Sequence, residues 1–232
     1  MPEAPQSARA LFGADILALS RHGAIGLGVG AAAGIALCLI VGLYPWFSND
    51  AEALGLIGLT LALPLGTAAG KTGAANPSAR ASLLRGLCSG LGLALALTAW
   101  GEYFGIALSW FGAAALLGAG LASLSRNGAA ASVACLLWLT LCALPFFYDK
   151  LAMTPLGGAS EVGASRLSPW LGFAQTALAT DPLRRTLLYF GHWTELSGAP
   201  AQGFLSATQL WCLAVFAMVA GLARNAFKKP AA

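Results

Sequence analysis

The chain has 232 residues, of which 58% are hydrophobic and only 9% are charged. About a quarter of the residues in an ordinary soluble domain are charged, so this composition excludes a soluble globular protein and predicts an integral membrane protein. The formal net charge of +4 is explained by Lys and Arg between apolar runs, which leaves no support for a nucleic-acid partner.

Basic residues occur on every second connection between six apolar runs. The connections near 46–52 and 101–105 carry none. Because cytoplasmic loops are enriched in Lys and Arg, this alternation predicts six crossings with both termini in the cytoplasm. The predicted fold is therefore all-α, a single transmembrane domain over 1–232 in a bacterial-type cytoplasmic (inner) membrane. The basic residues that define the cytoplasmic side are Arg9, Arg21, Lys71, Arg80, Arg85, Arg126, Arg224, Lys228 and Lys229.

Residues 6–21 place apolar side chains at helical spacing among charged ones, which predicts an amphipathic helix in the cytoplasmic interface. It serves either as a lead-in to the first crossing or as a docking element. The apolar run that follows is too long for a signal-peptide core, so we expect it to stay in the membrane. A crossing needs roughly 20 apolar residues. We expect crossings at about 23–44, 53–70, 86–102, 106–124, 129–147 and 207–224.

The first crossing contains Gly26, Gly30 and Gly34, a doubled G-x-x-x-G pattern. Small residues at this spacing allow another helix to approach closely in a membrane, where apolar burial does not drive association. The pattern predicts helix packing, either within the chain or as the seam of a dimer.

The connection after the second crossing is the predicted cytoplasmic contact. Asn76 and Pro77 read as a turn, and Ser78 caps a short helix that runs toward Arg85. Such a helix, presented between two crossings, is a candidate contact for a soluble partner. The stretch GTAAGKT at 66–72 has three residues between its glycines where a phosphate-binding P-loop needs four, so no nucleotide site is expected there.

Residues 149–206 form the predicted outer segment. Within it, 168–179 is apolar but too short to span, which predicts a re-entrant or interfacial helix with Ser168 as cap and Pro169 at the first helical position. A second short helix is expected from Asp181 through 190.

Few side chains suggest chemistry. The two histidines, His22 and His192, are predicted on opposite sides of the membrane, so no bis-histidine site forms within one chain. The cysteines lie in apolar runs without nearby ligands, which favours packing roles over a metal site. No catalytic set, cofactor or metal is predicted. The five cysteines are Cys38, Cys88, Cys135, Cys142 and Cys212.

The layout resembles the permease subunits of ABC-2-type (type V) ATP-binding-cassette transporters. These have six crossings with both ends inside, an interface helix, a coupling helix after the second crossing, a tight hairpin after the third and short re-entrant helices before the last. The stretch SRLSPWLGFAQTALATDPLRRTLLYFGHW is also similar to their outer region. The corresponding segments here are 6–21, 71–85, 101–105 and 166–192.

The resemblance implies transport of an unidentified, lipid-like or polymeric substrate without bond chemistry in this chain. ATP hydrolysis is expected on a separate ATPase subunit, and a second permease chain completes a homo- or heterodimer. In many members of this family an acidic residue follows a Gly-Thr pair in the coupling loop. In this chain no acidic residue follows Thr67, and the charged residues of the loop are all basic. The resemblance assigns coupling to Asn76, Arg80 and Arg85, and an outer gate to Trp170, Gln175 and Tyr189.

Two other functions remain open from the sequence. The glycine-rich packing faces and the scarcity of polar groups in the crossings suit a non-transporting assembly or scaffold subunit of a membrane complex. A membrane enzyme active at the outer face is the third reading. Its candidate residues are Glu161, Asp181, His192 and Glu195.

Overall fold

The computed structural model describes seven segments of the chain, and every regular element in them is a helix. The described residues are 8–42, 51–71, 79–98, 103–124, 129–144, 167–178 and 205–227. The helices are α1 (Ala8–Gly42), α2 (Ala51–Lys71), α3 (Ala79–Thr98), α4 (Phe104–Leu124), α5 (Ala129–Ala143), α8 (Pro169–Phe173), the π-helix η2 (Ala174–Leu178) and α9 (Ala207–Ala226).

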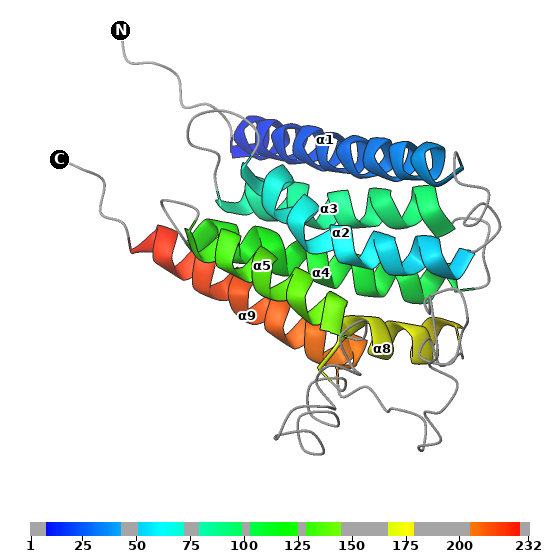
Figure 1. Ribbon diagram of the computed structural model, residues 1–232. Coiled ribbons are helices and arrows are strands. Elements are labelled where there is room, and N and C mark those ends of the chain that lie inside the picture. The colour runs from blue at the N-terminus through cyan, green and yellow to red at the C-terminus, as the bar shows by residue number, and fades with distance from the viewer. Residues whose placement is uncertain are drawn as a thin grey trace, which may run out of the picture.

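The long helices lie side by side and alternate in direction along the chain (Figure 1). The first residues of α1 and α3 and the last residues of α9 lie at one end of the bundle, which we call the Arg80 end. The short helix α8 lies at the opposite end, which we call the Trp170 end. The two ends therefore present different parts of the chain.

Helix length and hydropathy make the chain a multi-pass membrane protein. Five described helices are long and apolar enough to cross a bilayer. The fifth predicted crossing, 129–147, contains the shorter apolar helix α5, which has 15 residues. The five spans are Leu17–Ile40, Leu54–Lys71, Ala79–Thr98, Phe104–Leu124 and Ala207–Arg224.

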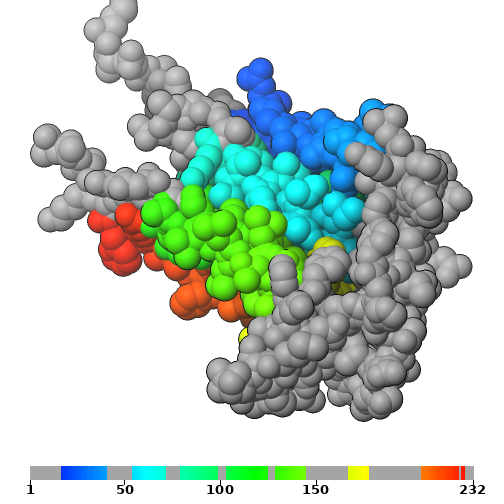
Figure 2. Space-filling model, in the orientation of Figure 1, coloured from blue at the N-terminus to red at the C-terminus, as the bar shows by residue number. Residues whose placement is uncertain are grey.

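Burial separates central from peripheral helices. In α3 and α4, 67% and 61% of the spanning residues are buried, against 17% in α1 and 22% in α9. Large apolar side chains on the peripheral helices are exposed, such as Leu39 on α1 and Phe216 on α9. Figure 2 shows α1, α2, α5 and α9 together on one face of the molecule. Exposed apolar side chains of this kind are what a helix presents to lipid.

The amphipathic helix predicted over 6–21 is not separate from the first crossing. α1 is one continuous helix of 35 residues, so residues 8–21 and the first crossing belong to the same helix. The prediction of two helices is therefore wrong over residues 8–42. The physical reason is that this run is rich in Ala and Leu and contains no proline, so nothing in it interrupts the helical hydrogen bonds.

The predicted coupling helix is likewise continuous with the third crossing. α3 runs from Ala79 to Thr98, so the residues up to Arg85 are its first turns and not an independent helix. The prediction of a separate helix ending before 86 is wrong for the described residues. Asn76, Pro77 and Ser78 lie outside them.

The helix predicted over 168–179 is present as α8 followed directly by η2. Ser168 holds the N-cap position and Pro169 the first helical position, where its missing N–H costs nothing. The Ser168 side chain makes no capping hydrogen bond, and its Oγ is buried. The second helix expected from Asp181 lies outside the described residues.

α9 begins at a well-defined cap. The backbone N–H of Gln209 donates to Ser206 Oγ at 3.3 Å, and the N–H of Ser206 donates to Gln209 Oε1 at 2.8 Å. This reciprocal capping box satisfies two donors that the first turn leaves free. The last long helix therefore starts at a fixed position after Ser206.

Candidate functional site

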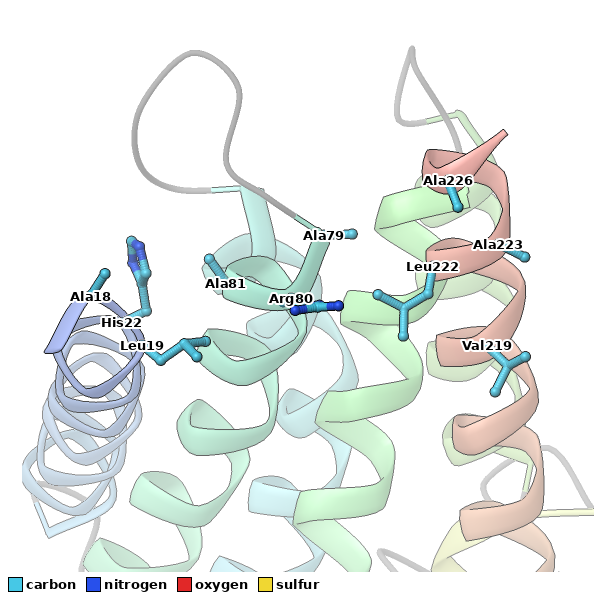
Figure 3. Close-up of a pocket in the computed structure, with 10 residues that line it drawn as sticks. All are labelled: Ala18, Leu19, His22, Ala79, Arg80, Ala81, Val219, Leu222, Ala223 and Ala226. Carbon is cyan, nitrogen blue, oxygen red and sulfur yellow. The ribbon is translucent and has the colours of Figure 1, made fainter. Parts of the chain in front are cut away.

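An open groove of about 770 Å³ lies at the Arg80 end between α1, α3 and α9 (Figure 3). Eight of its ten lining residues are apolar, and the other two are Arg80 and His22. None of the described residues that line it is acidic. The lining residues are Ala18, Leu19, His22, Ala79, Arg80, Ala81, Val219, Leu222, Ala223 and Ala226.

Arg80 lies in the first turn of α3 and is exposed. Figure 3 shows its side chain extending from α3 toward Leu222 of α9. The same turn of α3 carries the positive end of the helix dipole. The guanidinium and the helix terminus therefore add to one positive potential in the groove.

His22 faces the groove from α1. Its side chain is partly buried, and its Nδ1 atom is buried without a hydrogen-bond partner among the described residues. A buried imidazole nitrogen that makes no hydrogen bond is costly in an apolar environment. The sequence placed His22 and His192 on opposite sides of the membrane and gave no reason to connect His22 with Arg80.

Arg85 lies one turn further along α3 and is only 2% exposed. Its Nε donates a long hydrogen bond of 3.4 Å to the carbonyl oxygen of Ala81, a residue that lines the groove. Its Nη2 is buried and has no hydrogen-bond partner among the described residues. A buried arginine in a membrane helix is expensive and is by default a functional candidate. Its burial also keeps it from touching a soluble partner directly.

The three glycines of the G-x-x-x-G pattern in α1 pack against α3 of the same chain. A Cβ on Gly26 would clash with the backbone of Arg85, and one on Gly30 would clash with the carbonyl of Ser89. Gly92 makes the reciprocal close approach, because a Cβ there would meet the carbonyl of Leu27. Gly34 faces Ala96. The α1–α3 seam therefore starts beside the groove and runs along both helices with their backbones in close contact.

At the Trp170 end, α8 is seated in the bundle. Trp170 is 8% exposed, and its Nε1 donates to Thr60 Oγ1 on α2 at 2.7 Å. Phe173 is fully buried and packs edge-on against Trp110 of α4, with ring centroids 6.0 Å apart. A second edge contact, at 6.4 Å, joins it to Tyr103. Aromatic packing and one polar contact thus fix this helix against α2 and α4.

The gate residues taken from the resemblance fall partly in this region. Trp170 belongs to α8, and the half-buried Gln175 belongs to η2. Trp110 donates from its indole nitrogen to Thr176 Oγ1 at 3.1 Å, which connects η2 to α4. Tyr189 lies outside the described residues. π-Helical turns are rare and are often found at functional sites.

The candidate residues of the membrane-enzyme reading, Glu161, Asp181, His192 and Glu195, lie outside the described residues. No group of three or more His, Cys, Asp or Glu among them is placed to hold a metal ion. All five cysteines are free thiols, and Cys135, which packs against the apolar core, donates from its Sγ to Thr67 Oγ1 at 3.6 Å. Comparison with family models, curated proteins and solved structures gives no match. What the arrangement provides is a basic groove at one end of a bundle and a seated short helix at the other.

Proposed function

We propose that the chain is the membrane-spanning permease subunit of an ABC-2-type ATP-binding-cassette transporter. The observation that carries the proposal is the placement of α8. This short helix packs into the bundle at the end opposite the start of α1 and α3, and with η2 it precedes the last long helix among the described elements. In the proposal the Arg80 end faces the cytoplasm and the Trp170 end faces outward, with six crossings in an inner membrane.

The ATPase subunit binds at the Arg80 end in this proposal. Its contact is the connection 72–78, which contains Asn76 and leads into α3. A force on the first turn of α3 reaches α1, because the backbones of the two helices meet at Gly26, Gly30 and Gly92. Arg80 provides exposed positive charge for the contact with the ATPase. The buried Arg85 holds α3 in place against α1. ATP-driven closure therefore moves α1 and α3 as one unit.

The Trp170 end provides the gate in the same proposal. α8 and η2 are tied to α2 through Thr60 and to α4 through Trp110, so a shift of these crossings moves Trp170 and Gln175. Tyr189 belongs to the same proposed gate. Two permease chains, identical or different, enclose the path between them. The apolar surfaces of the crossings suit a lipid-like or polymeric substrate.

A scaffold function is the second candidate. The observation that favours it is the close packing of the central helices, in which Trp110 and Phe111 are fully buried and few polar groups occupy the interior of the described bundle. A subunit of this kind would hold other membrane proteins together without moving a substrate. It needs no contact with an ATPase.

Site-specific photocrosslinking separates these functions. Benzoylphenylalanine at position 76 is expected to crosslink to the ATPase in isolated membranes. The matched control is position 136, because Leu136 is 66% exposed on α5 and is expected to face lipid. ATPase crosslinked at 76 and not at 136 supports coupling. Equal crosslinking at both positions, or none at 76 in a folded complex, overturns it.

A further inference from the structure

We infer that the groove between α1, α3 and α9 binds the phosphate headgroup of an anionic phospholipid, with the acyl chains along the apolar faces of α1 and α9. This lipid site shares Arg80 with the proposed coupling surface, but its test needs no ATPase and does not rest on the transport proposal. It assigns a ligand to the groove whether the chain is a permease or a scaffold.

The positive charge of the groove favours an anionic ligand. Arg80 extends into it, His22 lines it, and the N-terminal turn of α3 adds a positive partial charge. No acidic side chain among the described lining residues offsets these groups. Basic pockets between membrane helices near the cytoplasmic surface are known to suit phospholipid headgroups.

Two buried nitrogen atoms beside the groove lack hydrogen-bond partners in the described part of the chain. One is Nη2 of Arg85, a residue that is only 2% exposed, and the other is Nδ1 of His22. Arg85 Nε donates to the carbonyl oxygen of Ala81 one turn earlier in α3, and Arg85 itself does not line the groove, whereas His22 does. His22 lies one helical turn before Gly26, which packs on the backbone of Arg85.

A phosphate group fits this arrangement chemically. Arginine is a donor in every protonation state found in proteins, and a histidine nitrogen donates when it carries a proton. Phosphate oxygens accept such hydrogen bonds, and those from charged donors are the strong ones. A headgroup in the groove would therefore accept from Arg80 and provide the acceptor that His22 Nδ1 lacks.

The walls of the groove favour a lipid over a soluble anion. Eight of its ten lining residues are apolar, and the volume of about 770 Å³ is much greater than one phosphate ion needs. The groove continues into exposed apolar surface on both peripheral helices, at Leu19 on α1 and at Val219 and Phe216 on α9. Acyl chains would cover this surface, whereas free phosphate would leave it bare.

Lipid titration of the full-length chain tests the site. The chain is purified in detergent without lipid, and binding of dioleoyl phosphatidylglycerol and of dioleoyl phosphatidylcholine is measured by native mass spectrometry. Phosphatidylglycerol is expected to bind at least about fivefold more tightly, because one basic residue contributes about a fivefold preference for an anionic lipid. Arg80→Gln is expected to remove about fivefold of that affinity.

Lys71→Gln is the matched control, since Lys71 is exposed at the same end of the bundle but does not line the groove. Its lipid affinity is expected to stay within twofold of the wild type. Ala223→Phe fills the groove without changing charge and is expected to weaken both lipids. It therefore tests the location of the site separately from its charge.

Three results overturn the inference. The first is equal binding of the two lipids by the wild type. The second is an equal effect of Arg80→Gln and Lys71→Gln, which is the result expected if the groove instead holds a segment of a protein partner. The third is inorganic phosphate at millimolar concentration displacing phosphatidylglycerol, which would identify a site for a soluble anion.

Discussion

The indole nitrogen of Trp170 donates a hydrogen bond of 2.7 Å to Thr60 Oγ1, a residue 110 positions earlier in the chain. The Thr60 hydroxyl in turn donates to the carbonyl oxygen of Leu56 at 2.9 Å, so its lone pairs are oriented toward the indole. This contact joins α8 to the middle of α2. Its strength determines how firmly the short helix is held.

Thr60→Val is expected to lower the free energy of unfolding by about 1–2 kcal/mol, because the substitution removes the acceptor of a largely buried N–H group. Trp170→Phe removes the donor of the same bond. The double mutant should show a coupling of about 0.6–1.7 kcal/mol, the range measured for hydrogen bonds between membrane helices. Unfolding in mixed micelles provides all four values. Fully additive effects would show that the contact contributes nothing.

Gly30→Ala is expected to destabilise the protein by about 1–3 kcal/mol, the usual cost of overpacking. A Cβ at this position would overlap the carbonyl of Ser89, so α1 must move away from α3. Gly28→Ala is the control on the same helix, since no atom lies within 4 Å of a Cβ there. It should be neutral or slightly stabilising because alanine favours the helix. Equal effects of the two variants in the same unfolding assay would contradict the packing of this seam.

Arg85→Met is expected to raise the midpoint of thermal unfolding in lipid-free detergent. The buried guanidinium has an unpaired nitrogen, and replacing such a charge with an apolar side chain of similar size is often stabilising. Arg80→Met should have little effect, because Arg80 is exposed. The midpoints are compared by following the loss of helical circular dichroism. A marked fall for Arg85→Met would mean that the guanidinium makes stabilising contacts in the folded protein.

The continuity of α1 predicts a long distance between its ends. Spin labels at positions 10 and 39 should be about 44 Å apart along a straight helix, at 1.5 Å per residue. A right-angle bend at His22, as in a separate interface helix, would shorten this to about 31 Å. Double electron–electron resonance in lipid nanodiscs distinguishes the two values. The shorter distance would restore the two-helix interpretation.

Hydropathy and helix-cap residues predicted where the long helices lie. They did not predict that α1 and α3 each extend through a segment expected to be separate. Ser168 and Pro169 mark the start of α8 where the sequence places it, since these signals act within one turn. The sequence left 6–21 as either a lead-in to the first crossing or a docking element, and it did not predict that Arg85 belongs to α3. Charge alone placed Arg85 in a connection, whereas its burial depends on the approach of α1 at Gly26.

The candidate site also depends on contacts between helices that the sequence does not predict. Arg80 was singled out from the sequence, but its relation to His22 and to α9 depends on which helices are neighbours in space. No local pattern connects Trp170 with Thr60 across 110 residues. The one feature of the sequence that pointed to this contact was a threonine within an apolar helix. Many such threonines hydrogen-bond only to the backbone of their own helix, so this feature does not identify a partner.

The most direct test of the permease proposal is co-purification. A tagged copy of the chain is extracted in mild detergent from its native membrane, and bound proteins are identified and tested for ATP hydrolysis. The proposal predicts a stoichiometric ATPase with a complete P-loop, of the kind expected from a neighbouring reading frame. A folded chain that retains other membrane proteins but no ATPase would contradict it and favour the scaffold function.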